Sequence, residues 1–317
     1  MIKTPVCSII IRAYNEEKHI RRLLQGIAEQ TLTDVQVILV DSGSTDGTIE
    51  ATKHYPVEVV TILPENFTFG RSLNLGFAAA RSDLVVMASA HVYPVYPDWL
   101  EQILAPFNNP KVGLSYGKQR GADHSHFSEQ QIFKHWYPES SDPHQAHPFC
   151  NNANAAIRRT LWELHPYDET LPGLEDLEWA KWAQGEGHRI AYVAQAEVIH
   201  VHSESQHGIF NRYQREGMAF KRIYPHERFG KLDLIRLFYH NVVDDLKGAR
   251  QQGVLLRNFR NIIRFRWSQF SGTYHGYRQS GPLTWALRQA FYYPRYTGVT
   301  TGDDGKRDIE PIQYSKI

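Results

Sequence analysis

The sequence predicts an α/β fold in which a mostly parallel sheet is flanked by helices and followed by a helical C-terminal extension. Two observations lead to this prediction. Short apolar runs alternate with amphipathic segments through the first hundred residues, and from about residue 206 the chain becomes helical and aromatic. Apolar strands separated by helices form parallel sheets that are covered on both faces. With 317 residues, 42% of them hydrophobic, the chain can build a sizeable core.

The first hundred residues contain four predicted strands and the helices between them. The first helix, about residues 17–30, has apolar residues at the i, i+3, i+4, i+7 spacing of one buried face. A polar turn then leads into a second helix, which Thr45 or Asp46 is placed to cap. The predicted strands are residues 6–11, 35–40, 57–63 and 84–88, and a further helix includes residues 74–81.

The second half of the chain has a weaker pattern. Residues 111–117 and 189–199 have the character of strands, and between them lie loops rich in Pro, His and Asn. Residues 246–301 carry nine Lys and Arg and no Asp or Glu, which gives a local charge of +9. The last fifteen or so residues have the composition of a polar tail.

Composition restricts the class of protein. The 35 Lys and Arg balance 34 Asp and Glu, so the molecule as a whole does not attract nucleic acid. Two cysteines, Cys7 and Cys150, cannot form a disulfide framework, which favours a reducing compartment. The first strand follows the N-terminus too closely for a signal peptide, and no apolar stretch approaches the length of a membrane span. We therefore expect a cytoplasmic protein.

Three polar segments follow predicted strands at the same edge of the sheet: residues 13–16, 41–46 and 89–91. Ligands of open α/β sheets bind at this edge, so the three segments are expected to line one crevice. The chain has neither GxGxxG after the first strand nor GxxxxGK[ST] anywhere, so the ordinary dinucleotide and P-loop motifs are absent.

Two of these segments carry a family resemblance. Residues 11–16 (I-R-A-Y-N-E) and 40–48 (V-D-S-G-S-T-D-G-T) resemble the opening motifs of family 2 glycosyltransferases, which have the Rossmann-like GT-A fold. The similarity covers roughly residues 6–202. Within the family, the chain is most similar to the rhamnosyltransferase-like members, through residues 69–76, 116–119 and 198–202.

The resemblance implies an inverting transfer of a sugar from a nucleotide-sugar donor to a saccharide or lipid-linked saccharide acceptor, in polysaccharide or glycoconjugate biosynthesis. It implies a catalytic domain over residues 1–203, with a nucleotide-sugar half (1–96) and an acceptor half (97–203). The helical, basic and aromatic C-terminal region then covers residues 204–317.

The donor is expected to bind at the three strand ends. Asp41 is an acceptor-only carboxylate that can receive hydrogens from a nucleobase, and Asp46 would complete that pocket. In the alternative interpretation, both carboxylates only cap the next helix. The guanidinium of Arg71 suits diphosphate oxygens, unless it is simply solvated. The expected donor-binding residues are Ala13, Tyr14, Asn15, Glu16, Asp41, Ser42, Gly43, Asp46, Arg71, Asn74, Ser89 and Ala90.

A divalent metal is expected beside the donor. The family's D-x-D motif, which holds this ion against the diphosphate, is replaced here by Ser89-Ala90-His91. Imidazole favours Mn²⁺ or other transition ions, whereas oxygen ligands suit Mg²⁺. His200 stands where the family often has a metal-ligating histidine, and His202 shares its face in extended chain. We expect Mn²⁺ or Mg²⁺ at His91, His200 and His202; alternatively, His91 donates a hydrogen bond directly to a phosphate.

The acidic pair Glu175-Asp176 begins a predicted helix and matches the family's G-x-E-D segment. An inverting transfer needs a base for the acceptor hydroxyl. The resemblance makes Asp176 that base, which a helix N-terminus would help to keep ionised, and Glu175 a group that orients or binds the acceptor. Alternatively, the helix dipole alone favours the two acids there.

The acceptor side is expected around the segment of residues 149–159. Asn151 and Asn152 can both donate to and accept from sugar hydroxyls. Trp179, like Trp182 and Trp136, could stack on a sugar ring or belong to the core.

The basic C-terminal region could contact an anionic membrane surface, where each nearby Lys or Arg adds about 1 kcal/mol. Such peripheral contact would bring the enzyme to a lipid-linked acceptor. Alternatively, these helices pack on the catalytic domain or form a homodimer. A sugar-nucleotidyltransferase would need a Gly-rich basic loop after the first strand, which residues 13–17 lack. A noncatalytic protein that binds saccharide or nucleic acid through the +9 segment is a further alternative, although we expect no nucleic acid partner.

Overall fold

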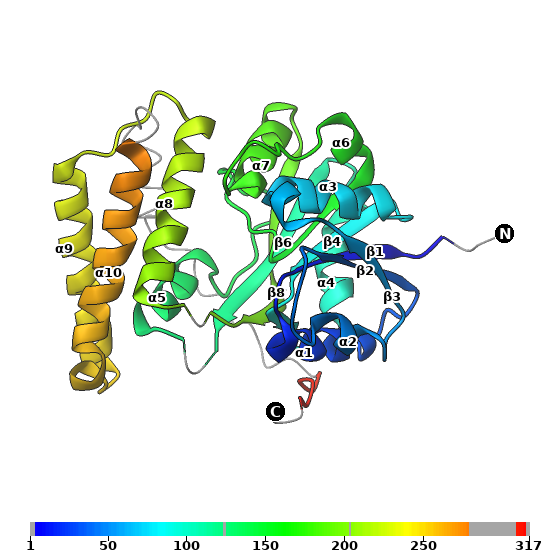
Figure 1. The fold of residues 1–317 in the computed structure, drawn as a ribbon, viewed down its shortest axis with the longest axis horizontal. Coiled ribbons are helices and arrows are strands. Elements are labelled where there is room, and N and C mark those ends of the chain that lie inside the picture. Colours follow the sequence, from blue (N-terminus) through cyan, green and yellow to red (C-terminus); the bar gives the residue numbers. More distant parts are fainter. Residues whose placement is uncertain (1–3, 123–124, 203, 279–308, 315–317) are drawn as a thin grey trace.

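The computed structural model describes residues 4–122, 125–202, 204–278 and 309–314. It shows a sheet covered by helices and, beside it, the long helices of the C-terminal region (Figure 1). The predicted fold class is confirmed.

One eight-stranded sheet has the strand order β3-β2-β1-β4-β7-β6-β8-β5. Strands β1 to β4 are parallel neighbours, as predicted. In the other half, β7 is antiparallel to β4 and β6, β8 is parallel to β6, and β5 is antiparallel to β8. The strands are β1 (Cys7–Ala13), β2 (Val35–Asp41), β3 (Val57–Thr61), β4 (Leu84–Ser89), β5 (Val92–Pro94), β6 (Val112–Gly121), β7 (Asn154–Arg158) and β8 (Arg189–His200).

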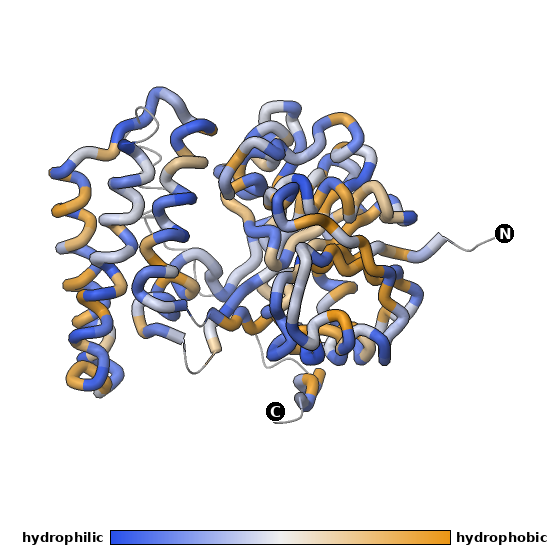
Figure 2. Tube along the Cα trace, viewed as in Figure 1, coloured by the Kyte–Doolittle hydropathy of each residue, from blue (hydrophilic) through white to orange (hydrophobic). Residues whose placement is uncertain are grey.

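Alternate residues of the central strands build an apolar layer on each face of the sheet. In β1, Ile9 and Ile11 belong to one layer and Ile10 to the other, and burying each contributes about 2 kcal/mol. Figure 2 shows this hydrophobic character along the central strands. One layer packs on α1 (Glu17–Ala28), α2 (Thr48–Thr52) and α4 (Trp99–Leu104), and the other on α3 (Phe69–Ala79), α6 (Arg159–Leu164) and α7 (Glu175–Gly185).

The strand register brings the polar segments after β1, β2 and β4 to one edge of the sheet, because Ala13 pairs with Asp41 and Arg12 with Ser89. The first two segments are joined by hydrogen bonds: the Ser44 hydroxyl accepts from the Asn15 amide, and the Asn15 side chain accepts from the Thr45 amide. Gly43 has φ +86°, and a Cβ there would lie 2.8 Å from the Pro64 ring. Only glycine fits this turn without strain.

The C-terminal helices are α8 (Gln206–Ile223), α9 (Lys231–Gln251) and α10 (Leu255–Arg278). Helices α8 and α10 approach closely at Gly276, where a Cβ would lie 2.2 Å from the Gln214 carbonyl oxygen. Helices α9 and α10 share a buried ion pair in which Arg266 donates to both oxygens of Asp245 at 2.8 Å.

The C-terminal helices also pack on the sheet-containing part. Phe220 and Phe270 share an apolar cluster with Leu177 of α7, and Ile262 packs with Phe127 of α5 (Phe127–Trp136). Packing on the catalytic part was one of the alternatives for this region.

Part of the predicted polar tail, residues 309–314, contacts the sheet at β5. Here the Ile312 amide donates to the Val95 carbonyl oxygen, and the ring of Tyr314 packs on Tyr93 with centroids 4.9 Å apart. Ile312 and Tyr314 are half-buried at this contact, while the other residues of the segment are exposed. Residues 279–308, which include the predicted basic positions Arg288 and Arg295, lie outside the described residues.

Both cysteines are buried and free. Among the described helices, none combines the length and apolar character needed to cross a bilayer.

Candidate active site

A cavity of about 420 Å³ opens at the edge of the sheet where α7 and α8 meet the strand ends. We call it the catalytic cavity. It brings together the predicted base, the three predicted metal ligands and the predicted asparagines. Its walls include Arg12, Glu16, Phe69, Ser89, His91, Asn151, Asn152, Glu175, Asp176, His200, His202, Glu204, Arg212, Arg215 and Glu216.

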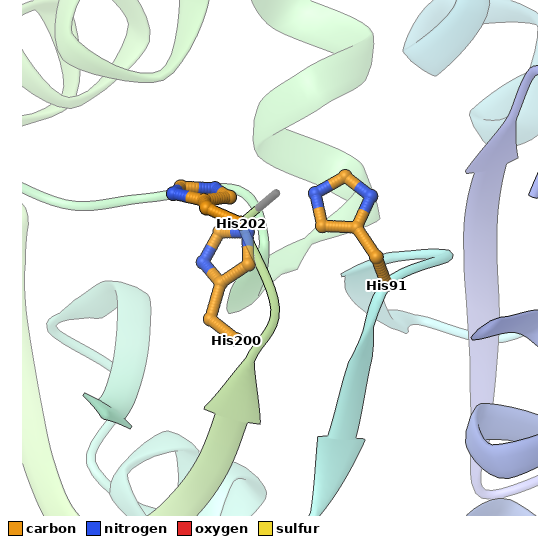
Figure 3. Close-up of side chains that lie close together, drawn as sticks. All are labelled: His91, His200 and His202. Atoms are coloured by element: carbon orange, nitrogen blue, oxygen red, sulfur yellow. The ribbon is translucent and has the colours of Figure 1, made fainter. Parts of the chain in front are cut away.

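Three histidines from two neighbouring strand ends gather in this cavity (Figure 3). His200 ends β8 and pairs in register with Val92, the residue after His91. One ring nitrogen of each of His91, His200 and His202 lies within 4.8 Å of the others. The pairing of β5 with β8 therefore brings His91, which replaces the acid of D-x-D, next to His200 and His202.

Each histidine is oriented by an oxygen at 2.7 Å from its Nδ1 atom. The partners are the Glu16 carboxylate for His91, the Gln119 amide oxygen for His200 and the Glu129 carboxylate for His202. These oxygens accept, so Nδ1 donates and Nε2 keeps its lone pair. Nε2 of His200 is buried and has no hydrogen-bond partner among the described residues. This is how proteins orient histidines toward a metal.

The electrostatics favour neutral imidazole, the form that binds metals. Burial, assisted by His202, His91 and Arg212, lowers the pKa of His200 well below its usual value. Burial, together with the nearby Arg212 and His91, also lowers the pKa of His202 well below its usual value. The positive charge of Arg212, on α8, compensates the negative charges of two carboxylates beside the histidines. Arg212 pairs with both Glu129 and Glu204 at 2.8 Å.

The acidic pair lies at the N-terminus of α7, after Leu174 with a left-handed φ of +56°. Such strain in a non-glycine residue persists where the surroundings enforce it, often at functional sites. Glu175 is buried and pairs with Arg12 at 2.9 Å. Asp176 faces the cavity and accepts from the amides of Leu177 and Asn152.

The environment of Asp176 differs from the sequence expectation. A helix N-terminus alone would lower the pKa of a carboxyl group. Here burial, followed by the Glu175 carboxylate, raises the pKa of Asp176 to about 7, against the two amide hydrogen bonds and Arg12. A carboxyl with a pKa near neutrality is well matched to accepting a proton as a general base.

The two predicted asparagines line the cavity next to Asp176. The Asn152 side-chain oxygen accepts from the Tyr167 hydroxyl, while its amide nitrogen is buried and meets no described polar atom. The Asn151 oxygen accepts from the Ala153 amide. Asn152 therefore has an unused buried donor, which is the group a bound hydroxyl or phosphate oxygen would satisfy.

Two arginines of the cavity flank the ring of Phe69. The guanidinium carbon of Arg12 lies 5.2 Å from the ring centroid, and that of Arg215 lies 4.8 Å from it. By contrast, Arg71 is nearly half exposed, lies 3.8 Å from Glu169 and does not line this cavity.

The carboxylates of Asp41 and Asp46, both predicted donor-binding residues, accept hydrogen bonds from backbone amides. Asp41 is buried and accepts from the amides of Gly43 and Ser44, which fixes the glycine turn. Asp46 accepts from the Thr48 and Glu17 amides, so the capping alternative describes its contacts. The remaining predicted donor residues divide by exposure: Tyr14 and Asn15 are exposed, whereas Ala13, Ser42 and Ala90 are buried.

Two predicted site residues are structural. Asn74 uses its whole amide within the fold: its oxygen accepts from Trp162 and the Tyr167 amide, and its nitrogen donates to Glu169 and the Tyr167 carbonyl. Trp179 is fully buried in the core and donates to the His165 carbonyl oxygen. The prediction that Trp179 binds the acceptor is therefore wrong, because no face of its ring is accessible.

Sequence analysis missed two residues that orient histidines, three that α8 contributes, and the acid that pairs with Arg212: Gln119, Glu129, Arg212, Arg215, Glu216 and Glu204. Gln119 belongs to the family-like segment of residues 116–119, whereas the other five residues belong to no recognisable motif. The only available signal was the acidic and basic clustering on the predicted helix after residue 206.

Comparison with known proteins agrees with this geometry. The pattern described as "Glycosyl transferase family 2" matches residues 8–164. The O-antigen chain rhamnosyltransferase WbaN of Salmonella anatum is 27% identical over 227 residues, which are 68% of this chain and 72% of that protein. The O-antigen chain rhamnosyltransferase RfbN of Salmonella typhimurium is 25% identical, with 67% and 71% covered.

Solved structures share the fold. A mannosyltransferase from Pyrobaculum calidifontis in complex with GDP-Man and Mn²⁺ has a TM-score of 0.59 at 19% identity and covers 86% of each chain. Residues 1–349 of TarS from S. aureus, in complex with UDP-GlcNAc, have a TM-score of 0.54 at 17% identity, with 86% and 91% covered.

The fold and the sequence matches together define a glycosyltransferase with the GT-A fold. Residues 8–164 match glycosyltransferase family 2, and the chain is similar to O-antigen chain rhamnosyltransferases over about two thirds of its length.

Proposed function

We propose that this chain is an inverting glycosyltransferase that moves a hexosyl or deoxyhexosyl group from a nucleotide sugar to a saccharide or lipid-linked saccharide in polysaccharide assembly. The observation that carries the proposal is that one cavity holds Asp176, with its raised pKa, together with the three histidines. The relatives that act on O-antigen chains support the polysaccharide acceptor.

In this reaction the acceptor hydroxyl oxygen attacks the anomeric carbon from the face opposite the nucleotide. Its proton passes to Asp176 as the new C–O bond forms. The bond from the anomeric carbon to the diphosphate breaks, and the nucleoside diphosphate leaves with the electron pair. Glu175, paired with Arg12, holds that guanidinium at the cavity wall, and Arg215 supplies a further positive charge for the diphosphate.

The three histidines fit a divalent ion. Their Nδ1 atoms have oxygen partners, and the buried Nε2 of His200 has no described partner. An all-imidazole set favours a transition ion such as Mn²⁺ over Mg²⁺. When bound, this ion would neutralise charge on the departing diphosphate. We propose it as the cofactor; the complex of the Pyrobaculum enzyme with Mn²⁺ supports a divalent ion.

Metal binding is testable without turnover. Chelator-treated protein titrated with Co²⁺ is expected to give the visible absorption of a nitrogen-coordinated ion, and His200→Gln to abolish it. His207→Gln, at an exposed position on α8, is the matched control. His91→Asp should shift the preference toward Mg²⁺, because it restores an oxygen ligand. Full activity in excess chelator would reject the metal and favour His91 as a phosphate hydrogen-bond donor.

The nucleotide is proposed to bind over the glycine turn, with Asp41 accepting hydrogens from the base. The transfer itself is tested by incubating the protein with UDP-, GDP- and dTDP-sugars and measuring release of nucleoside diphosphate, and by determining the anomeric configuration of the product. Inverted product is expected. Formation of nucleoside triphosphate and sugar 1-phosphate when pyrophosphate is added to the nucleotide sugar would indicate a nucleotidyltransferase. Ligand binding without turnover would indicate a noncatalytic saccharide- or nucleic-acid-binding protein.

We also propose peripheral contact with an anionic membrane, through the outer face of α10. Leu256, Phe259 and Trp267 are 97%, 47% and 54% exposed on this face. Arg257, Arg260 and Arg264 are exposed among them, whereas Arg266 is buried against Asp245. Exposed apolar side chains interleaved with arginines are typical of interfacial helices. A homodimer through the same face is the alternative that the test must separate.

A further inference from the structure

A second cavity adjoins the catalytic cavity beside Asp176. Its volume is about 180 Å³. Both cavities are lined by Asp176, Asn151 and Glu216, together with four further residues: Leu174, His200, His202 and Arg212. The rest of its wall is mainly aromatic, and we call it the aromatic chamber. Its rings are those of Phe133, Trp136, Tyr137, Phe149, Tyr213 and Phe220.

The two cavities differ in chemistry. The catalytic cavity holds histidines, arginines and acids, which suit a charged diphosphate. The aromatic chamber combines apolar rings with a few polar groups, the usual composition of a site for a neutral organic ligand. Asp176 lines both cavities, so a ligand in the chamber can present a group to the base.

Glu216 of α8 stands at the same boundary. The other acids of the catalytic cavity have direct partners: His91 for Glu16, Arg12 for Glu175, Arg212 for Glu204, and backbone amides for Asp176. The described residues place no hydrogen bond or close ion pair on the carboxyl of Glu216. Its positive neighbours are already engaged, since Arg212 pairs with Glu129 and Arg215 stacks over Phe69. The oxygens of Glu216 therefore remain available to a ligand.

We propose that Glu216 binds the acceptor saccharide, whose hydroxyls donate hydrogen bonds to its carboxylate while the apolar face of the sugar packs in the aromatic chamber. This inference rests on the proposed transfer function and adds the residues that select the acceptor. Sugar hydroxyls are donors that a carboxylate can accept in pairs. The acceptor held in this way directs its reacting hydroxyl toward Asp176.

A third cavity extends the chamber. It has a volume of about 290 Å³, lies between α5 and the helices α9 and α10, and shares Ile132, Trp136 and Gln269 with the chamber. Its wall is polar, with Lys134, Asn241 and Asp244. The acceptor class that fits this series of cavities is the end of an oligosaccharide, with one sugar in the chamber and the next beyond Trp136.

The test is ligand-observed saturation-transfer NMR on the full chain in the presence of nucleoside diphosphate. The probes are methyl glycosides of hexoses, 6-deoxyhexoses and N-acetylhexosamines, and maltotriose as a longer probe. Glu216→Gln is expected to weaken glycoside binding by about tenfold or more, the effect of losing a hydrogen bond to a charged group. Trp136→Leu is expected to weaken maltotriose more than the monosaccharides. Glu186→Gln and Tyr239→Leu, both at exposed positions, are the matched controls.

If Glu216 had a purely structural role, Glu216→Gln would weaken the binding of glycosides and of nucleoside diphosphate alike. We therefore expect Glu216→Gln to weaken glycoside binding much more than nucleoside diphosphate binding, with an unaltered melting temperature. Unchanged glycoside affinity in this variant, or an equal loss of nucleotide affinity, would overturn the proposal. So would a wild-type chain that turns over a nucleotide sugar but binds none of the probes. Glycoside binding without turnover of any nucleotide sugar would instead reject the transfer reaction, and with it the acceptor role of Glu216.

Discussion

Asp176 and Glu175 are adjacent in sequence but differ in their environments. Glu175 has a cationic partner, whereas Asp176 has only backbone amides and lies beside the Glu175 carboxylate. The different environments assign different roles to the two acids: Glu175 forms an ion pair with Arg12, and Asp176 can exchange a proton near neutral pH.

The pH dependence of transfer follows from this difference. Because the pKa of Asp176 is raised to about 7, the group is protonated and inactive as a base below this pH. The rate of the chemical step is therefore expected to rise as pH increases through 7 and then to level off. Single-turnover kinetics across this range measure it. A rate that stays flat through neutrality, with chemistry rate-limiting, would contradict the assignment of the base.

Asp41 stabilises the glycine turn in addition to making the proposed contact with the nucleotide. Asp41→Asn keeps an oxygen for the Gly43 and Ser44 amides but turns the other atom into a donor, which would oppose the donor groups of a base. We expect about tenfold weaker nucleoside diphosphate binding by calorimetry, the effect of one lost hydrogen bond and an unpaired donor. Asp46→Asn, whose contacts are to the first amides of α1 and α2, should alter stability but not affinity. Equal affinities in all three proteins would limit Asp41 to shaping the turn.

At the scale of elements, α8 contributes to two functions. It anchors the C-terminal helices on the sheet-containing part, and it supplies Arg212, Arg215 and Glu216 to the catalytic cavity. The site is therefore complete only with this helix, although the sequence expectation assigned residues 204–317 to a separate region. The domain boundary at residue 203 stays a prediction.

Helix α10 carries the proposed membrane face. Replacing Arg257, Arg260 and Arg264 by glutamine is expected to reduce binding to vesicles that contain phosphatidylglycerol by about 100-fold, from about 1 kcal/mol for each charge. Co-sedimentation measures it, with pure phosphatidylcholine vesicles as reference. The matched control removes the same charge from exposed positions of the sheet-containing part, by changing Lys18, Lys53 and Lys111 to glutamine.

If the control variant and the arginine variant bind these vesicles equally well, the membrane proposal is wrong. Concentration-dependent dimerisation that the arginine changes abolish would assign the face to the homodimer instead.

At the scale of the whole molecule, the sequence was sufficient for features that depend on neighbouring residues. Apolar strands and polar strand ends are local patterns, so the parallel half of the sheet could be located from them. The acidic pair on α7 and the three histidines were located through the resemblance to family 2 glycosyltransferases. The strand β7 could not, because its Asn-Ala-Ala start has the composition of a loop. Contacts such as Gln119 to His200 and Glu129 to His202 depend on tertiary packing, which residue spacing does not encode.

Burial also could not be determined from residue type. Asn74 and Trp179 have the chemistry of ligand-binding residues, yet one holds the 167–169 segment and the other fills the core. Arg215, which matched no motif, lines the catalytic cavity, while Arg71 within a family-like segment does not.

The most direct test of the account is the comparison of wild-type protein with Asp176→Asn in two measurements, donor affinity and sugar transfer. The substitution preserves volume and removes the proton acceptor. The account predicts that transfer falls by at least about 100-fold while the affinity for the nucleotide sugar is unchanged. Near-normal transfer by a folded Asp176→Asn protein would contradict it.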